Sequence, residues 1–384
     1  MSFTRQRFLI EAYFVSLCIK LIIAPWSTGV YLNPVGQLLN NLCDATWIIA
    51  TLIGAVYIFR AYKTVFVPAI IVAISYCLST VLYTDESALS FLSWYLKVFI
   101  PLLAAPVIWE CSKQEKALLI SRCKFLVVLV AALVFVGLAF LPSIMNRLVS
   151  WSPAYFSGLH STAYVACMSA ILVHALYKHQ HVGIKLFLAY LAVVFVLVYQ
   201  MWGVRTASLL LISFYLINFL MNSKVGRYKL SLYIPYFFAA MLLLLLFVDM
   251  SIINSTSSGR ISMYIDKYEQ LMENDVLQWL IGNGYKSDLI ATDIWWWALK
   301  GAHSDVITML VEGGVIFLAS FLYILNQYYS NGNSFIKCLI IAAMVSALFS
   351  NGVFVRPIAG YIFSFCLVLF MIEKEKDNEV AVGI

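Results

Sequence analysis

Charged side chains are scarce in this sequence. Of its 384 residues only 11% are Asp, Glu, Lys or Arg, whereas 63% are hydrophobic, and the mean hydropathy is +0.90. Soluble domains carry about 25% charged residues, so the composition excludes an ordinary water-soluble domain. Because the apolar excess runs along the whole chain, we expect an all-α polytopic membrane protein embedded in a lipid bilayer.

The sequence also lacks the patterns of several familiar chemistries. Its eight cysteines are scattered without CxxC spacing, and none falls in the polar loop 252–302, which argues against a disulfide framework or a zinc site. HExxH, P-loop and GxSxG motifs are missing. The first outer loop, PWSTGVYLNPVGQ, has no paired carboxylates, which argues against a metal-dependent transferase built there. We therefore expect no metal, no cofactor and no nucleic-acid partner.

About twelve stretches of the chain approach the roughly 20 apolar residues that a spanning helix needs. The predicted spans lie near residues 8–24, 40–59, 64–82, 89–109, 118–141, 155–177, 183–201, 204–221, 230–251, 303–325, 334–350 and 355–372. The chain thus divides into about nine spans in 1–251, a large loop in 252–302, about three spans in 303–372 and a tail in 373–384. No cleavage site follows the basic start MSFTRQRF, so the first span is expected to be retained.

Lys and Arg are concentrated in alternate connections. The basic connections are RAYK at 60–63, ECSKQEKALLISRCK at 110–124, YKHQHVGIK at 177–185 and NSKVGRYK at 222–229. The connections YTDES at 83–87 and 252–302 carry acidic residues instead. Because positive loops face the cytoplasm, we expect both termini and the tail to be cytoplasmic and the loop 252–302 to lie outside.

The loop 252–302 begins with an amphipathic pattern. Apolar residues recur at helical spacing, at Ile261, Tyr264, Ile265, Tyr268, Leu271 and Met272. Much of the opposite face is polar, with Asp266, Lys267, Glu269, Gln270 and Glu273. We expect this helix to lie along the outer membrane surface and the turn GNGY, with Gly282 and Gly284 in structural roles, to end it.

Three arginines lie at the predicted outer face. Arg205 begins the eighth span, Arg260 begins the amphipathic helix, and Arg356 follows the last outer turn. Guanidinium groups match phosphate oxygens and stay charged, and the helix N-terminus at Arg205 favours an anion. Three arginines at one level therefore indicate a binding site for a polyanion. The alternative for each is an interfacial anchor that reaches the lipid headgroups.

His303 and Glu312 belong to the tenth span, in AHSDVITMLVEGG. The helix N-terminus disfavours the imidazolium form of His303, so its ring should stay neutral and act as a general base. The alternative is an interfacial histidine bonded to a carbonyl. Glu312 lies about 13 Å deeper and faces away from His303 on an ideal helix. We assign Glu312 a structural role against a neighbouring helix, where Gly313 and Gly314 allow close approach.

Three other residues are weaker candidates for lining a cavity or contacting a sugar. Trp296 lies in a run of three tryptophans that can stack on sugar rings, although a belt at the membrane interface is the commoner explanation. His160 enters a span from the outer side, in FSGLHSTAYVA. Tyr264 belongs to the apolar side of the amphipathic helix.

These motifs together resemble the O-antigen polymerase and ligase superfamily. The shared features are many spans, one large outer loop late in the chain, SGR entering it, GNG within it and AHSDVITMLVEGG leaving it. GVRTAS, at the start of an upstream span, matches loosely, and the resemblance covers roughly residues 155–330. GLHSTAYVA departs from the Asn-Pro-Asn-like sequence of many relatives, which leaves the role of His160 open.

The resemblance implies glycan transfer from undecaprenyl diphosphate, without a metal, at the periplasmic face of the bacterial inner membrane. Arg205 and Arg260 would grip the diphosphate, and His303 would deprotonate or orient the acceptor hydroxyl. Fixed cations beside the leaving group would stabilise the departing diphosphate. A chain-length regulator and a flippase are the implied partners.

Three functions remain open at this stage. We prefer a polymerase that joins repeat units of an O-antigen, capsule or exopolysaccharide. A ligase that transfers the glycan to lipid A core would use the same donor. A polysaccharide transporter or flippase is the alternative from another class, although transporters tend to hold ionisable groups near the bilayer midplane.

Overall fold

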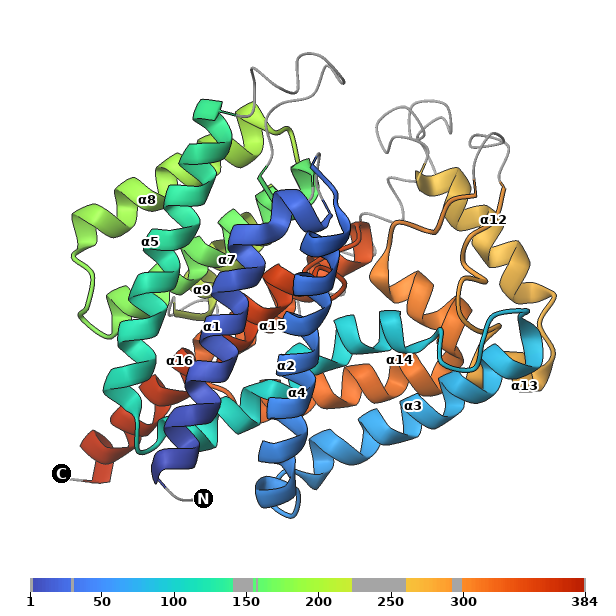
Figure 1. Ribbon diagram of the computed structural model, residues 1–384, viewed down its shortest axis with the longest axis horizontal. Coiled ribbons are helices and arrows are strands. Elements are labelled where there is room, and N and C mark those ends of the chain that lie inside the picture. Colours follow the sequence, from blue (N-terminus) through green and yellow to red (C-terminus); the bar gives the residue numbers. More distant parts are fainter. Residues whose placement is uncertain are drawn as a thin grey trace.

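The computed structural model describes residues 3–28, 31–140, 155–156, 158–222, 260–291 and 299–382. Within these ranges the chain is helical, and its only extended pairing is an isolated bridge between Ile290 and Lys300. The helices, shown in Figure 1, are α1 (Phe3–Ser27), α2 (Pro34–Ile58), α3 (Lys63–Tyr83), α4 (Leu92–Ser112), α5 (Lys116–Phe140), α7 (Leu159–Lys178), α8 (Ile184–Val196), the π-helical turn η1 (Leu197–Met201), α9 (Arg205–Asn222), α12 (Arg260–Met272), α13 (Val276–Ile281), α14 (Asp305–Asn331), α15 (Ser334–Phe349) and α16 (Pro357–Val382).

Eight helical stretches in the described part are long and apolar enough to cross a membrane. They are α1, α2, α3, α4, α5, α7, the continuous α8–η1 and α14. Three shorter apolar helices, α9, α15 and the first part of α16, fall on further predicted spans. The polytopic all-helical class is therefore confirmed. The predicted span 230–251 lies outside the described residues, and the count of about twelve stays a prediction.

Connections that the charge pattern places on the same side of the membrane contact each other. Lys286 of the large loop is ion-paired with Glu86, in the connection between α3 and α4, at 2.6 Å. At the opposite end of α3, the Tyr62 hydroxyl donates to Glu110 at the end of α4, also at 2.6 Å. α1 begins and α16 ends at the same end of the helix bundle (Figure 1). This arrangement fits a chain that crosses back and forth, while the side that faces the cytoplasm stays a prediction.

Proline within a span removes a helical hydrogen bond, and a neighbouring helix replaces it. Pro106 in α4 has no N–H to offer the Leu102 carbonyl, which accepts the Tyr328 hydroxyl of α14 at 2.6 Å. An unsatisfied carbonyl in apolar surroundings is costly. The bond therefore ties α4 to α14, the helix that follows the candidate base.

α14 is broken at Gly314, whose backbone has φ 68° and ψ −169°. The break leaves carbonyls of the preceding turn without their helical donors. The turn after α13 supplies replacements, because the Asn283 N–H donates to the Val311 carbonyl and the Gly284 N–H to the Glu312 carbonyl, both at 2.9 Å. The GNG and EGG motifs of the sequence are thus the two halves of one junction.

Glycine permits the close contact at this junction. A Cβ atom on Gly282 would lie 2.2 Å from the Glu312 carbonyl oxygen, and one on Gly314 would lie 2.4 Å from the Gly282 nitrogen. Both glycines also have positive φ, a conformation that strains other residues. The turn can therefore approach α14 only with glycine at these two positions.

The helix α12 buries one residue that the sequence pattern places on its polar face. The helix α12 buries one line of side chains against the protein, Met263, Lys267 and Leu271. Lys267, expected on the water-exposed face, is 0% exposed, because Asp288 supplies a counter-charge that the pattern within α12 could not reveal. The opposite side of α12 exposes the apolar residues Ile265, Tyr268 and Met272. Contact of that side with the membrane surface stays a prediction.

Alanine substitutions at three glycines distinguish the cost of backbone strain from the cost of the steric overlap found at the junction. Gly282→Ala combines positive φ with overlap, Gly203→Ala has positive φ in open space, and Gly183→Ala has neither. We expect a loss of about 1 kcal/mol or less for Gly183→Ala, which changes the N-cap of α8, about 1–3 kcal/mol for Gly203→Ala and a larger loss for Gly282→Ala. Thermal unfolding of the purified proteins in detergent measures the order. Equal midpoints for Gly282→Ala and Gly183→Ala would contradict the close approach.

Candidate functional site

His303 lies in the connection that leads into α14. The helix starts at Asp305, and the Ser304 side chain caps it by accepting the Ile307 N–H at 3.4 Å. The prediction that His303 opens the helix is therefore wrong by two residues. His303 has φ 51°, a sparsely populated conformation for a residue with a side chain, which persists only when the surroundings hold it.

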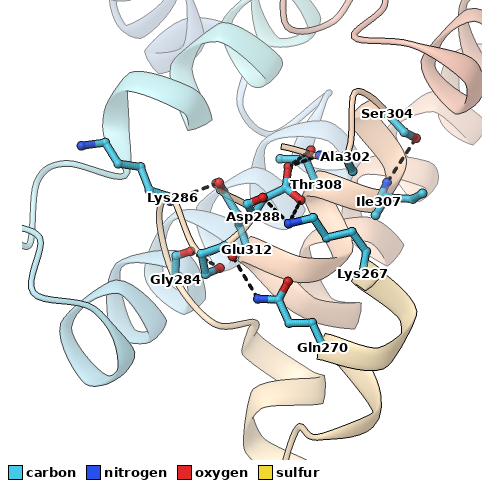
Figure 2. A network of polar contacts seen from close by, with 11 residues as sticks. Lys267, Gln270, Gly284, Lys286, Asp288, Ala302, Ser304, Ile307, Thr308 and Glu312 are labelled. Atoms are coloured by element: carbon cyan, nitrogen blue, oxygen red, sulfur yellow. Dashed lines mark hydrogen bonds and ion pairs between the residues drawn. The ribbon is translucent and has the colours of Figure 1, made fainter. Parts of the chain in front are cut away.

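Asp288 holds the backbone beside His303 (Figure 2). Its Oδ2 accepts the Ala302 N–H at 2.9 Å and the Thr308 hydroxyl at 2.7 Å, while its Oδ1 lies 3.2 Å from Lys267 Nζ. The Lys267 ammonium also donates to the Asp288 carbonyl. Burial lowers the pKa of Lys267, and the Asp288 carboxylate opposes that shift. This buried ion pair links α12, the turn region after α13 and the start of α14 around the candidate base.

Two of the three predicted arginines lie near His303. Arg260 Nη1 donates to the Phe349 carbonyl, at the end of α15, at 2.6 Å. Arg356 Nε donates to the Asn351 carbonyl at 2.9 Å. Arg356 Nη1 donates to the Ser161 hydroxyl of α7 at 3.0 Å. Both guanidinium groups are therefore oriented by the protein at the ends of spanning helices.

The pKa of His303 is lowered from its ordinary value. Burial is the main cause, and the positive charges of Arg260, Lys300 and Arg356 add to it, while the Asp288 charge acts in the opposite direction. The neutral ring is favoured, in the direction that the sequence predicts, but through burial and nearby cations. Within the part of the chain that the structure describes, the ring makes no hydrogen bond, so the carbonyl-bonded alternative is not found there.

Two of the weaker candidates join this group. His160, in the first turn of α7, directly precedes Ser161, whose hydroxyl accepts from Arg356 Nη1 at 3.0 Å. The Tyr264 hydroxyl donates to the Leu348 carbonyl at 3.4 Å, one residue before the carbonyl that Arg260 binds. The group of His303, Arg260, Arg356, His160 and Tyr264 is called the outer site below.

One other predicted residue, Arg205, does not join the outer site. Arg205 begins α9 and is exposed. It makes no hydrogen bond or ion pair with the other described side chains. Trp296 lies outside the described residues. The sequence therefore brings two of its three arginines to His303, and the diphosphate role assigned to Arg205 stays a prediction.

Glu312 lies apart from the outer site and joins three elements. Its Oε2 accepts the Tyr76 hydroxyl of α3, and its Oε1 accepts the Lys286 N–H at 3.1 Å. Because its own helix is α14, the carboxylate connects α3, the turn after α13 and α14. Both oxygens are used in these contacts, and neither points to His303.

A cavity of about 490 Å³ lies between α1, α2, α4, α7 and the start of α16. The charged side chains in its wall are Lys20, Asp44, Lys97 and Arg356. Lys20 and Asp44 form an ion pair at 2.6 Å, and the Tyr361 hydroxyl donates to Asp44 at 2.5 Å. Arg356 therefore belongs to both the cavity and the outer site.

Sequence reasoning missed Lys20 and Asp44. The available signal was the presence of charged residues inside the first two apolar spans, Glu11 and Lys20 in 8–24 and Asp44 in 40–59, a position that is costly without a partner. No group of three or more His, Cys, Asp or Glu able to hold a metal ion was found among the residues that the structure describes. The side chains of the outer site offer proton transfer by histidine and anion binding by arginine.

The buried Lys267–Asp288 pair is expected to behave as one unit. Lys267→Met leaves Asp288 without its counter-charge and Asp288→Asn leaves Lys267 unpaired, and each change should cost about 3–5 kcal/mol. The double variant should recover part of the loss. Unfolding midpoints in detergent measure all three proteins. Losses that simply add would show that the two charges are not coupled.

The chain was also compared with known proteins. No family model, curated protein or solved structure matches it. The resemblance to the O-antigen polymerase and ligase superfamily therefore rests on short motifs.

Proposed function

We propose that the protein is a membrane glycosyltransferase that polymerises undecaprenyl-diphosphate-linked repeat units into a surface polysaccharide at the periplasmic face of the bacterial inner membrane. One observation carries the proposal: Ser304 and Asp305, directly after His303, donate to the Ala347 and Ser350 carbonyls, in the same segment whose Phe349 and Asn351 carbonyls hold Arg260 and Arg356. A proton acceptor and two fixed cations are what a metal-independent transfer from a diphosphate needs.

The proposed reaction is a direct displacement. The acceptor hydroxyl oxygen forms a bond to the anomeric carbon of the donor sugar, and the bond from that carbon to the diphosphate oxygen breaks. The electron pair of the broken bond leaves with the diphosphate, and the hydroxyl proton goes to neutral His303. Arg260 and Arg356 stabilise the negative charge that develops on the leaving group.

Both arginines have donors left for this task. A guanidinium carries five N–H groups; among the residues that the structure describes, Arg260 uses one on Phe349 and Arg356 uses two on Asn351 and Ser161. Burial lowers the pKa of Arg356, but the ordinary pKa of arginine is so high that the side chain stays charged. The remaining N–H groups are available to phosphate oxygens.

The location of the outer site supports a lipid-linked donor. His303 precedes α14 and Arg356 precedes α16, so both lie where spanning helices begin. The diphosphate of a polyprenyl carrier sits at that level, because its chain occupies the hydrocarbon and its sugars lie in water. A ligase that delivers the finished glycan to lipid A core would use the same site, and its product distinguishes it.

A second candidate, a polysaccharide transporter or flippase, is favoured by a different observation. Lys20 and Asp44 form an ion pair in a cavity between spanning helices, and α14 is broken at Gly314. Ionisable groups within spans and discontinuous helices are features of transporters. In that case the lipid-linked unit would cross the membrane without a new glycosidic bond.

Loss of the base is expected to abolish polymerisation. A strain lacking the protein is complemented with wild type, His303→Gln or His181→Gln, the last a matched change at an exposed histidine outside the outer site. We expect high-mass polymer with wild type and His181→Gln and single repeat units with His303→Gln at equal membrane abundance, on electrophoresis of the surface glycan.

The same experiment separates the alternatives. Polymer stranded on the carrier lipid, with none attached to lipid A core, would indicate a ligase. Precursor that accumulates on the cytoplasmic side would indicate a flippase. Normal polymer with His303→Gln would remove His303 from the proposed mechanism.

The rate should also report the protonation of His303. Its pKa lies below the ordinary value of about 6.5, so the ring is neutral at neutral pH and protonates only in more acidic solution. We expect the rate of polymerisation in liposomes to be constant around neutrality and to fall below about pH 6.5. The residual rate of His303→Gln should lack this fall, and an identical fall in both proteins would contradict the role as base.

A further inference from the structure

The cavity between α1, α2, α4, α7 and α16 is lined by polar side chains of which only Arg356 has a part in the proposed displacement. Its volume of about 490 Å³ falls within the roughly 300–1,000 Å³ of sites for small ligands. Beside the charged groups, its polar lining consists of hydroxyl and amide side chains, Ser27, Thr28, Asn40, Asn41, Ser93 and Ser161. Such a lining offers both donors and acceptors from several helices.

The cavity carries an excess of positive charge. Lys20, Lys97 and Arg356 line it, with Asp44 as the one carboxylate among its described lining residues. Lys20 and Asp44 neutralise each other at 2.6 Å, and Tyr361 donates to the same Asp44 oxygen at 2.5 Å. Arg356 is engaged in the outer site, so one cation, Lys97, remains to be explained.

Lys97 lies within α4, about 8 Å from the start of the helix at 1.5 Å per residue. Its side chain is exposed in the cavity wall, and it forms neither an ion pair nor a hydrogen bond with any other residue that the structure describes. An unpaired ammonium group inside a spanning helix is costly and marks a functional site.

We infer that this cavity binds an acidic sugar of the repeat unit and that Lys97 receives its carboxylate. The inference rests on the proposed function and deepens it by naming the substrate class, a glycan repeat that contains a sugar acid. An ammonium group and a carboxylate form strong charge-assisted hydrogen bonds. The Asn40 and Asn41 amides suit the hydroxyl groups of the same ring, and the Ser93 oxygen, which donates its hydrogen to the Tyr285 hydroxyl at 2.9 Å, can accept from one of them.

The position of the cavity agrees with a sugar close to the reacting bond. Arg356 lies in the cavity wall and bonds Ser161, which lines the cavity as well. A diphosphate held by Arg356 would therefore direct its attached sugars into the cavity. A phospholipid headgroup has fewer hydroxyl groups than this lining can bind, so we favour the sugar.

The test uses the lipid-linked precursor that accumulates in a strain lacking the protein. Half of the extracted precursor is treated with carbodiimide and borohydride, which convert carboxyl groups to alcohols. Wild type, Lys97→Gln and Lys97→Arg are reconstituted in phosphatidylcholine liposomes, and kcat/KM is measured with each donor. We expect wild type and Lys97→Arg to prefer the acidic donor about tenfold or more and Lys97→Gln to lose that preference.

If a variant fails to fold, the comparison of the two donors with wild type still tests the inference. A precursor without a sugar acid, or equal rates with the two donors, would overturn the inference. So would Lys97 variants that alter only the response to added phosphatidylglycerol, because the cavity would then be a lipid site. If wild type extends neither donor, the proposed function falls and this inference falls with it.

Discussion

The hydrogen bonds between the turn after α13 and the broken part of α14 support the outer site. Backbone groups in apolar surroundings must be satisfied, and here Asn283 and Gly284 satisfy carbonyls that the break at Gly314 leaves free. Once the turn is fixed, the Lys286 N–H reaches Glu312, and Asp288 reaches the backbone beside His303. The candidate base therefore takes its position from a junction that contributes no catalytic group.

Some of the buried or cavity-lining charges are paired and others are not. Lys267 with Asp288 and Lys20 with Asp44 are pairs, whose members compensate the desolvation of each other. Arg260, Arg356 and Lys97 have no acidic partner at salt-bridge distance among the described side chains. The members of each pair compensate each other's charge, whereas the unpaired cations near His303 and in the cavity are the basis for proposing an anionic ligand. These unpaired cations belong to the outer site and the adjoining cavity.

Much of the fold, and less of the site, could be predicted from the sequence. The spans follow from hydropathy, which depends on local composition alone. Lys267 was misassigned because its partner Asp288 is distant in sequence, and a helical period cannot report a contact with another element. Lys20 and Asp44 were overlooked for the same reason, since each is a lone charge until α1 packs against α2. The break at Gly314 was also missed, because one apolar run continues across it.

The interfacial-anchor explanation applies differently to the three arginines. An anchor extends its guanidinium to lipid headgroups and leaves it free to move. Arg260 and Arg356 are instead held by backbone carbonyls, at Phe349 and Asn351, whereas Arg205 is exposed. A carbonyl at the end of α15 is a favourable partner for a cation, so Arg260 stabilises that helix. The same bond fixes the direction of its other N–H groups, and donors oriented in advance are what stabilise a developing anion most. In Arg260 and Arg356, the bond to a backbone carbonyl therefore orients the remaining N–H groups for anion binding.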